Sequence, residues 1–106
     1  MTEESLELEE IVFKLVLHAG NARAKAYEAL DAAEEGCFEK AEELLDAADE
    51  EFVKGHKYQN LLVQGKISKH PNFLVIHSQD HLMTAMVEKN LIKRFVKIYK
   101  RLENNR

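Results

Sequence analysis

The stretch FLVIHSQDHLMTAMV, from Phe73 to Val87, decides the fold. Apolar residues fill both of its ends, and polar or ionisable residues, two of them histidines, lie in the middle. Read as a helix, the stretch carries two apolar stripes, which is more than two neighbouring helices of the same chain cover. The pattern therefore predicts a helix that also packs against other copies of the chain, with these helices on the axis of a symmetric oligomer.

This third helix is predicted to run from about Asn72 to Glu103. The stripe that we place on the axis consists of Phe73, Ile76, Asp80, Thr84, Val87, Leu91, Arg94 or Phe95, Ile98 and Leu102. The second stripe consists of Leu74, His77, His81, Ala85, Ile92, Val96 and Tyr99.

Two further helices precede it. The first is predicted from Glu3 to Glu35, with apolar residues at intervals of three and four, nearly all alanine from Ala19 onward, and with Gly36 as its stop signal. The second is predicted from about Phe38 to Val63, and its inward stripe turns polar at His56 and Gln59. Residues 1–106 should therefore form one all-α domain, an up-down-up antiparallel three-helix bundle that assembles into a homotrimer.

Composition excludes several classes of protein. The net charge of −4 argues against a nucleic-acid partner. Cys37 is the only cysteine, so no internal disulfide forms. The acidic N-terminus has no signal-peptide pattern, and no apolar run has the length of a membrane span, so we expect a soluble, cytoplasmic protein.

His77 and His81 are the residues most suited to chemistry. Four residues apart, both rings lie on one face of a helix. A neutral imidazole is a nucleophile near pH 7, and phosphorylation of a ring nitrogen gives a transferable phosphoryl group. Two other interpretations are a pair of hydrogen-bonded core histidines and a zinc site. The zinc interpretation lacks a glutamate after the first histidine and an obvious third ligand.

Asp80 interrupts the axial stripe with a carboxylate. Three copies meeting on a three-fold axis would form an oxygen cage for Mg²⁺ or a similar hard ion. Alternatively, Asp80 sets the register of the oligomer. His56 and Gln59 reach the His77 region only if the second and third helices are antiparallel, and His18 and His70 are expected at the surface or at helix edges.

Three blocks of the chain resemble a known family, the lactose/cellobiose-type enzyme IIA of the bacterial phosphotransferase system. Residues 77–85, HSQDHLMTA, closely match its His-Ala-Gln-Asp-His-Leu-Met-Thr signature. Residues 20–23 with 27–30 are similar to its first helix, and residues 39–42, 44–45 and 56–59 are similar to its second. The resemblance covers nearly the whole chain.

The resemblance implies a trimer of three-helix subunits in a phosphotransferase chain. His77 would accept a phosphoryl group from phospho-HPr and pass it to a cysteine of enzyme IIB, which serves the membrane subunit, enzyme IIC. His81 and Gln79 would orient His77 or bind phosphoryl oxygens, and Asp80 from three subunits would hold one Mg²⁺. The transported sugar would be a β-linked disaccharide of the lactose, cellobiose or chitobiose type. A non-catalytic helical scaffold or adaptor remains the alternative.

The chain departs from the family pattern in three places. Ser78 replaces the usual alanine or glycine, which is a small change. Cys37 replaces the usual aspartate before the second helix, and the loss of this N-cap should cost about 1 kcal/mol. The loop from Gln64 to Asn72 is about three residues shorter than usual and leads directly to His77, so partner preference is expected to differ.

Overall fold

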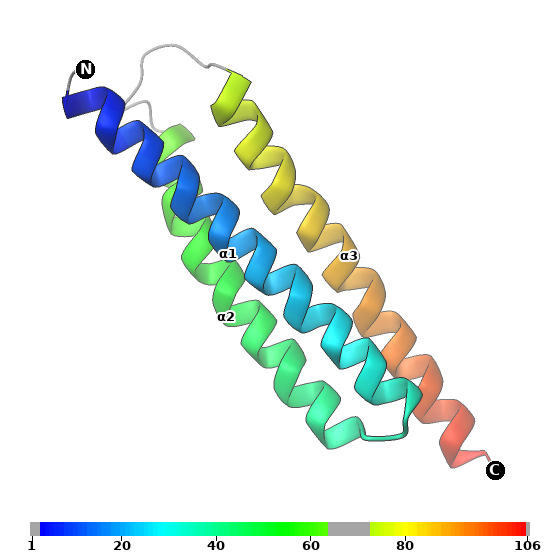
Figure 1. Cartoon of the computed structure of the whole chain (residues 1–106). Helices are drawn as coiled ribbons and strands as arrows, with labels where there is room; N and C mark the ends of the chain where they lie inside the picture. Colours follow the sequence, from blue (N-terminus) through cyan, green and yellow to red (C-terminus); the bar gives the residue numbers. More distant parts are fainter. Residues whose placement is uncertain (1–2, 64–72, 106) are drawn as a thin grey trace.

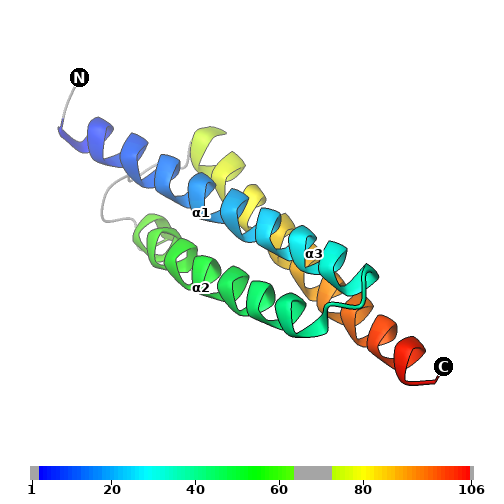
Figure 2. The same cartoon turned by 60° about the horizontal axis from the view of Figure 1, so that its bottom comes forward.

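The computed structural model describes residues 3–63 and 73–105, with side chains for residues 7–62 and 73–105. In this part of the chain it contains three α-helices, α1 (Glu3–Glu34), α2 (Phe38–Val63) and α3 (Phe73–Asn104), and no strands. The predicted all-α class is confirmed, and each helix end lies within one residue of its predicted position. Figures 1 and 2 show an elongated bundle in which α1 and α2 are joined by a short turn and α3 runs along α1.

The turn between α1 and α2 forms around Gly36, as the sequence predicts. Gly36 has a φ of +82°, a left-handed conformation in which a glycine avoids the clash of a Cβ. Its N–H donates to the carbonyl of Ala33, and the N–H of Cys37 donates to the carbonyl of Ala32. These two bonds satisfy carbonyls that the end of a helix leaves unpaired. The carbonyl of Cys37 then accepts the N–H of Ala41, so Cys37 occupies the N-cap position of α2.

The alanine stripe of α1 is buried along its whole length and explains the closeness of the helices. Small side chains let neighbouring backbones approach, and α1 packs against both α2 and α3, which contact each other less. One core cluster, near the α1–α2 turn, joins these alanines to Leu45, Ile92 and Val96. The other joins them to Phe52, Leu82 and Ala85. The second cluster lies beneath the segment of α3 that carries the histidines.

The faces of α3 differ from the prediction at its beginning. The inward stripe was expected to include Leu74, His77 and His81, but the buried residues are Val75, Ser78, Leu82, Ala85, Ile92 and Val96. Over the first turns of α3, each inward-facing residue is therefore one position later in the sequence than predicted. The reason is that Val75 and Leu82 bury apolar surface without the desolvation cost that an imidazole carries.

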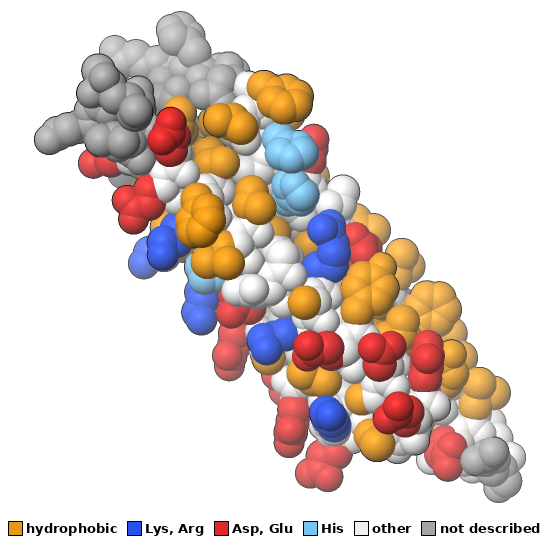
Figure 3. Space-filling view, in the orientation of Figure 1, with side chains coloured by type: hydrophobic (Ala, Val, Ile, Leu, Met, Phe, Trp, Pro, Cys, Tyr) orange, Lys and Arg blue, Asp and Glu red, His pale blue; other side chains and the backbone are white. Residues whose placement is uncertain are grey.

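The opposite face of α3 is apolar and exposed. Figure 3 shows hydrophobic side chains along the outer edge of the molecule, over the part of α3 that follows the histidines. The exposed large hydrophobic residues of this helix are Phe73, Leu74, Ile76, Met83, Val87, Leu91, Phe95, Ile98 and Leu102. A contiguous apolar surface of this kind marks an interaction site. Among the described residues, no helix combines the length and the apolar character of a membrane span.

Candidate functional site

His77 and His81 face each other one turn apart near the start of α3. Their Nε2 atoms are 3.1 Å apart, and their rings are nearly perpendicular, at 84°. Phe73, one turn earlier, stacks on His77 with an interplanar angle of 9° and ring centroids 5.8 Å apart. His77 is exposed and His81 is half-buried. The structure thus brings together the two imidazoles that the spacing placed on one face, and it leaves His77 open to a partner.

The residues next to the histidines fix the orientation of this part of α3. Leu82, directly after His81, is completely buried against α1 and α2. Ser78, directly after His77, is also completely buried, and its hydroxyl donates to the carbonyl of Val75 at 2.8 Å. Because Ser78 and Leu82 point into the bundle, His77 and His81 point along its side.

Asp80 lies on the outer face of α3. Its side chain is exposed, within the apolar surface that includes Ile76, Met83 and Val87. Within the described part of one chain, no three or more His, Cys, Asp or Glu side chains are grouped closely enough to hold a metal ion. A metal held by Asp80 would therefore need ligands from other subunits, and a zinc ion on His77 and His81 has no third ligand from these side chains.

The remaining predicted site residues are not brought to His77. Gln79 is two positions from His77, and residues at that spacing on a helix point in nearly opposite directions. His56 bonds to Gln59, with 2.9 Å between Nδ1 and Oε1. His18, which was expected near the surface, is largely covered, because it stacks on Tyr58 and bonds to Glu51 at 2.7 Å. His70 and the shortened loop lie outside the described residues.

Sequence reasoning missed a polar network between α1 and α3, beside the histidines. Arg23 of α1 binds two residues of α3: its Nε donates to Glu88 at 2.9 Å, and its Nη2 donates to Thr84 at 2.8 Å. The hydroxyl of Tyr27 donates to the other carboxylate oxygen of Glu88 at 2.5 Å. The hydrogen bond to Glu88, followed by the charge of Glu88, raises the pKa of Tyr27 above its usual value. Glu88 is therefore held by two residues of α1.

Thr84 connects this network to the turn that carries Asp80 and His81. Its hydroxyl donates to the carbonyl of Asp80 at 2.8 Å and, more weakly, to that of His81 at 3.3 Å. On α3, His77, His81, Thr84 and Glu88 are separated by four, three and four residues, so they share one face. The sequence therefore contained a signal that Thr84 and Glu88 share a face with the histidines. It contained no signal that Arg23 of α1 binds them.

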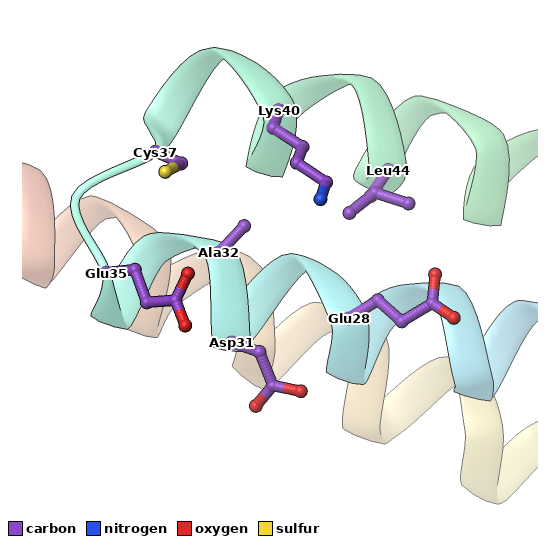
Figure 4. A pocket seen from close by; sticks show the side chains of 7 residues that line it. All are labelled: Glu28, Asp31, Ala32, Glu35, Cys37, Lys40 and Leu44. Atoms are coloured by element: carbon purple, nitrogen blue, oxygen red, sulfur yellow. The ribbon is translucent and has the colours of Figure 1, made fainter.

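A pocket of about 300 Å³ lies elsewhere, between α1 and α2 beside their turn. Figure 4 shows Glu28 and Asp31 of α1 and Glu35 of the turn along it, with Cys37 and Lys40 on the other side. The turn lies at the end of the bundle remote from the start of α3 (Figure 1). The pocket is therefore separate from the histidine pair, and Cys37, whose thiol is free and exposed, has no part in that pair.

Comparison with known proteins gives consistent results over nearly the full length. The profile of the family described as "PTS system, Lactose/Cellobiose specific IIA subunit" matches residues 10–100. The lichenan-specific phosphotransferase enzyme IIA component of Bacillus subtilis (strain 168) is 39% identical over 103 residues, which is 94% of each chain.

Two solved structures have the same fold. The crystal structure of the PTS cellobiose-specific enzyme IIA from Bacillus anthracis has a TM-score of 0.86 and 38% identity, covering 98% of this chain and 94% of that one. The IIA(chitobiose) chain, solved in complex with HPr from the Escherichia coli phosphotransferase system, has a TM-score of 0.83 and 31% identity. The match covers 91% of this chain and 96% of that one. On the family match and on these identities, the chain belongs to the lactose/cellobiose-specific IIA subunits of the phosphotransferase system.

Proposed function

We propose that this protein is a phosphoryl carrier that accepts a phosphoryl group from phospho-HPr on His77 and passes it to a cysteine of its cognate enzyme IIB. The observation that carries the proposal is the exposed His77 ring, whose Nε2 lies 3.1 Å from Nε2 of His81. Membership of the family supports the class of reaction. The solved complex of a related IIA chain with HPr supports the identity of the donor.

The transfer requires a lone pair on His77. In the bond between the two Nε2 atoms, one nitrogen donates and the other accepts. When His81 donates, Nε2 of His77 carries the lone pair, and the ring proton of His77 is on its Nδ1. As this nitrogen bonds to phosphorus, the bond between phosphorus and HPr breaks. In the second step the cysteine sulfur of enzyme IIB bonds to phosphorus, and the bond to His77 breaks.

His81 assists this chemistry without carrying phosphate. Once Nε2 of His77 is bonded to phosphorus, the Nε2–H of His81 lies where it donates to a phosphoryl oxygen. A hydrogen bond to a charged group contributes about 1.5–3 kcal/mol. Phosphoryl transfer depends chiefly on positioning and on compensation of charge. This contact and the open face of His77 therefore provide most of what the reaction requires of this protein.

The exposed apolar face of α3 supports an assembly of up-down-up subunits into a homotrimer. This face lies opposite the buried one and runs from Phe73 to Leu102. Asp80 is a carboxylate within it, and oxygen ligands suit Mg²⁺. Three Asp80 side chains on the axis would hold one Mg²⁺, which compensates their mutual repulsion.

Two other functions are weaker. A zinc centre would need a third ligand for His77 and His81, and the described residues provide no such group. A non-catalytic helical scaffold would give no role to the exposed imidazole of His77 or to its hydrogen bond with His81. We place the protein in the cytoplasm, where it would serve enzyme IIC indirectly, during uptake of a β-linked disaccharide. The sugar itself would be selected by that membrane subunit.

The test is reconstitution of the relay. The protein is incubated with enzyme I, HPr and radiolabelled phosphoenolpyruvate, and then with candidate enzyme IIB proteins. We expect one acid-labile phosphate per subunit and its transfer to one enzyme IIB. His77→Ala should remain helical by circular dichroism and accept no phosphate, while His56→Ala, a histidine on α2, should behave as wild type. A wild-type protein that takes no phosphate from phospho-HPr would overturn the proposal.

A further inference from the structure

Arg23 and Glu88 form an ion pair at the end of the face that carries His77. Their Nε and Oε1 atoms are 2.9 Å apart, and both side chains are about one-third exposed, at 30% and 31%. Nη2 of the same guanidinium donates to Thr84, which is one turn after His81. A cation of α1 is therefore fixed beside the helical face along which a phosphoryl group on His77 would lie.

The separation between this cation and His77 follows from helix geometry. Thr84 is seven residues from His77, which corresponds to about 10 Å along the axis at 1.5 Å per residue. The Nε2 atom of His77 faces His81, in the direction of Thr84. Arg23 is thus close enough to act on a phosphoryl group through its charge, without touching it.

Phosphorylation makes this charge important. A phosphoryl group adds a charge of about −1.5 to −2 at neutral pH. It would arrive on a face that already carries the carboxylate of Glu88, while that of Asp80 lies on the outer face of the same helix. Two other cations of α3, Lys89 and Lys93, bind Asp49 of α2 and so point to another side of the bundle. Arg23 is the cation that the hydrogen bonds place on the histidine face.

From this geometry we infer that the Arg23–Glu88 pair sets the equilibrium of phosphorylation of His77. Arg23 stabilises the phosphorylated form through its charge, and Glu88 opposes it while holding Arg23 in place. The inference rests on the proposed function, since it concerns a phosphoryl group on His77. Neither residue touches the reacting atoms, so both are positioning residues.

The two members of the pair allow a test that separates charge from structure. Both Arg23→Gln and Glu88→Gln break the same bridge between α1 and α3, so a merely structural role predicts similar changes in both. A role through charge predicts opposite changes. At about 10 mM ionic strength, Arg23→Gln should lower the equilibrium constant for acceptance from phospho-HPr by about two- to fivefold, and Glu88→Gln should raise it by a similar factor.

The equilibrium constant is the right readout because it depends only on the free energies of phospho-HPr, HPr, this protein and its phosphorylated form, each free in solution. Loss of a docking contact with HPr changes the rates and leaves this constant unchanged. For both variants, the ratio of the equilibrium constant to that of wild type should approach one at about 1 M salt, where charges are screened within about 3 Å. Arg23→Lys, which keeps the charge, should remain close to wild type. It also covers the case in which Arg23→Gln fails to fold.

A second ion pair provides the matched control. Lys100 and Glu42 are 2.8 Å apart and also join two helices, but Lys100 lies 23 residues after His77 on α3. That distance is about 35 Å, and Lys100→Gln and Glu42→Gln should not change the constant. Shifts in the same direction for Arg23→Gln and Glu88→Gln, or no shift in either, would overturn the inference. If the wild type accepts no phosphate on His77, the proposed function itself fails.

Discussion

Gly55 of α2 lies so close to Leu82 of α3 that a Cβ added to the glycine would be 2.9 Å from Cδ1 of the leucine. Leu82 is completely buried and directly follows His81. The contact therefore holds the helical turn that presents the histidine pair. A side chain at position 55 would therefore require the side chain of Leu82 to shift within the packed core.

We predict that Gly55→Ala destabilises the fold. Overpacking costs about 1–3 kcal/mol, and the better helix propensity of alanine returns about 1 kcal/mol, so the net loss should be about 1 kcal/mol. Gly20→Ala is the matched control, because a Cβ at Gly20 meets nothing within 4 Å. It should stabilise α1 by about 0.5–1 kcal/mol. Urea unfolding of the two variants checks this, and equal stabilisation of both would refute the close contact.

His81→Ala should still be phosphorylated but should transfer more slowly. Loss of one hydrogen bond to a phosphoryl oxygen, worth about 1.5 kcal/mol, corresponds to about a tenfold slower step. Rapid-quench measurements with phospho-HPr and with enzyme IIB give the two rates. His81→Gln, which keeps a donor, should recover part of the loss. Wild-type rates for His81→Ala in both directions would exclude a role for this residue.

Asp80 should make the assembly depend on metal. A metal bound only by the trimer stabilises it by mass action, so chelation should lower the melting temperature or dissociate the trimer. Asp80→Leu should remove this dependence, since an apolar side chain suits the face that holds Ile76, Met83 and Val87. Sedimentation with and without chelator measures both.

The control for this experiment is Asp31→Leu, which changes an exposed carboxylate of α1. It should sediment as wild type and keep the response to chelator. A monomer under all conditions would contradict the trimer. A wild-type trimer that is indifferent to chelator would contradict the metal.

Asp49 should contribute stability that is lost in acid. Burial raises the pKa of Asp49 and is the largest single effect, but the hydrogen bonds from Lys93 and Lys89 and the charges of these two lysines together outweigh it, so the net pKa lies below its usual value. A lowered pKa in the folded protein means that the stabilisation is complete above the unfolded pKa, about 3.9, and disappears as the pH falls through the folded value.

Asp49→Asn should therefore cost up to about 1 kcal/mol near pH 7, because the side chain is 40% exposed and the ion pairs are screened. The difference from wild type should vanish as the pH falls toward about 2. Urea unfolding across this range gives the difference. A loss that is the same at every pH would show that the charge of Asp49 is not its cause.

Local signals in the sequence were enough for the helices. Gly36 ends α1 because only a residue without a Cβ easily takes its φ of +82°. The buried alanines of α1 follow the spacing of three and four that the sequence shows. These features depend on residues that are close in sequence, so they can be predicted without knowledge of the tertiary contacts.

The sequence could not give the rotation of α3 or its polar network. The four residues before His77 are all apolar, so periodicity alone allowed either His77 or Ser78 to face inward, and the packing of Leu82 against α1 and α2 decides it. Arg23 and Glu88 are 65 residues apart, and their pairing depends on how α1 and α3 are aligned. Spacing within one helix carries no information on such an alignment.

Locating the phosphate within the protein shows whether His77 carries the phosphoryl group. Nuclear magnetic resonance of the histidine rings, recorded before and after phosphorylation by enzyme I and HPr, distinguishes the modified nitrogen in each imidazole. We expect one nitrogen of His77, Nε2, to become bonded to phosphorus, and the nitrogens of His81 to remain unmodified. A phosphate on His81 or on any other residue, with His77 unmodified, would contradict it.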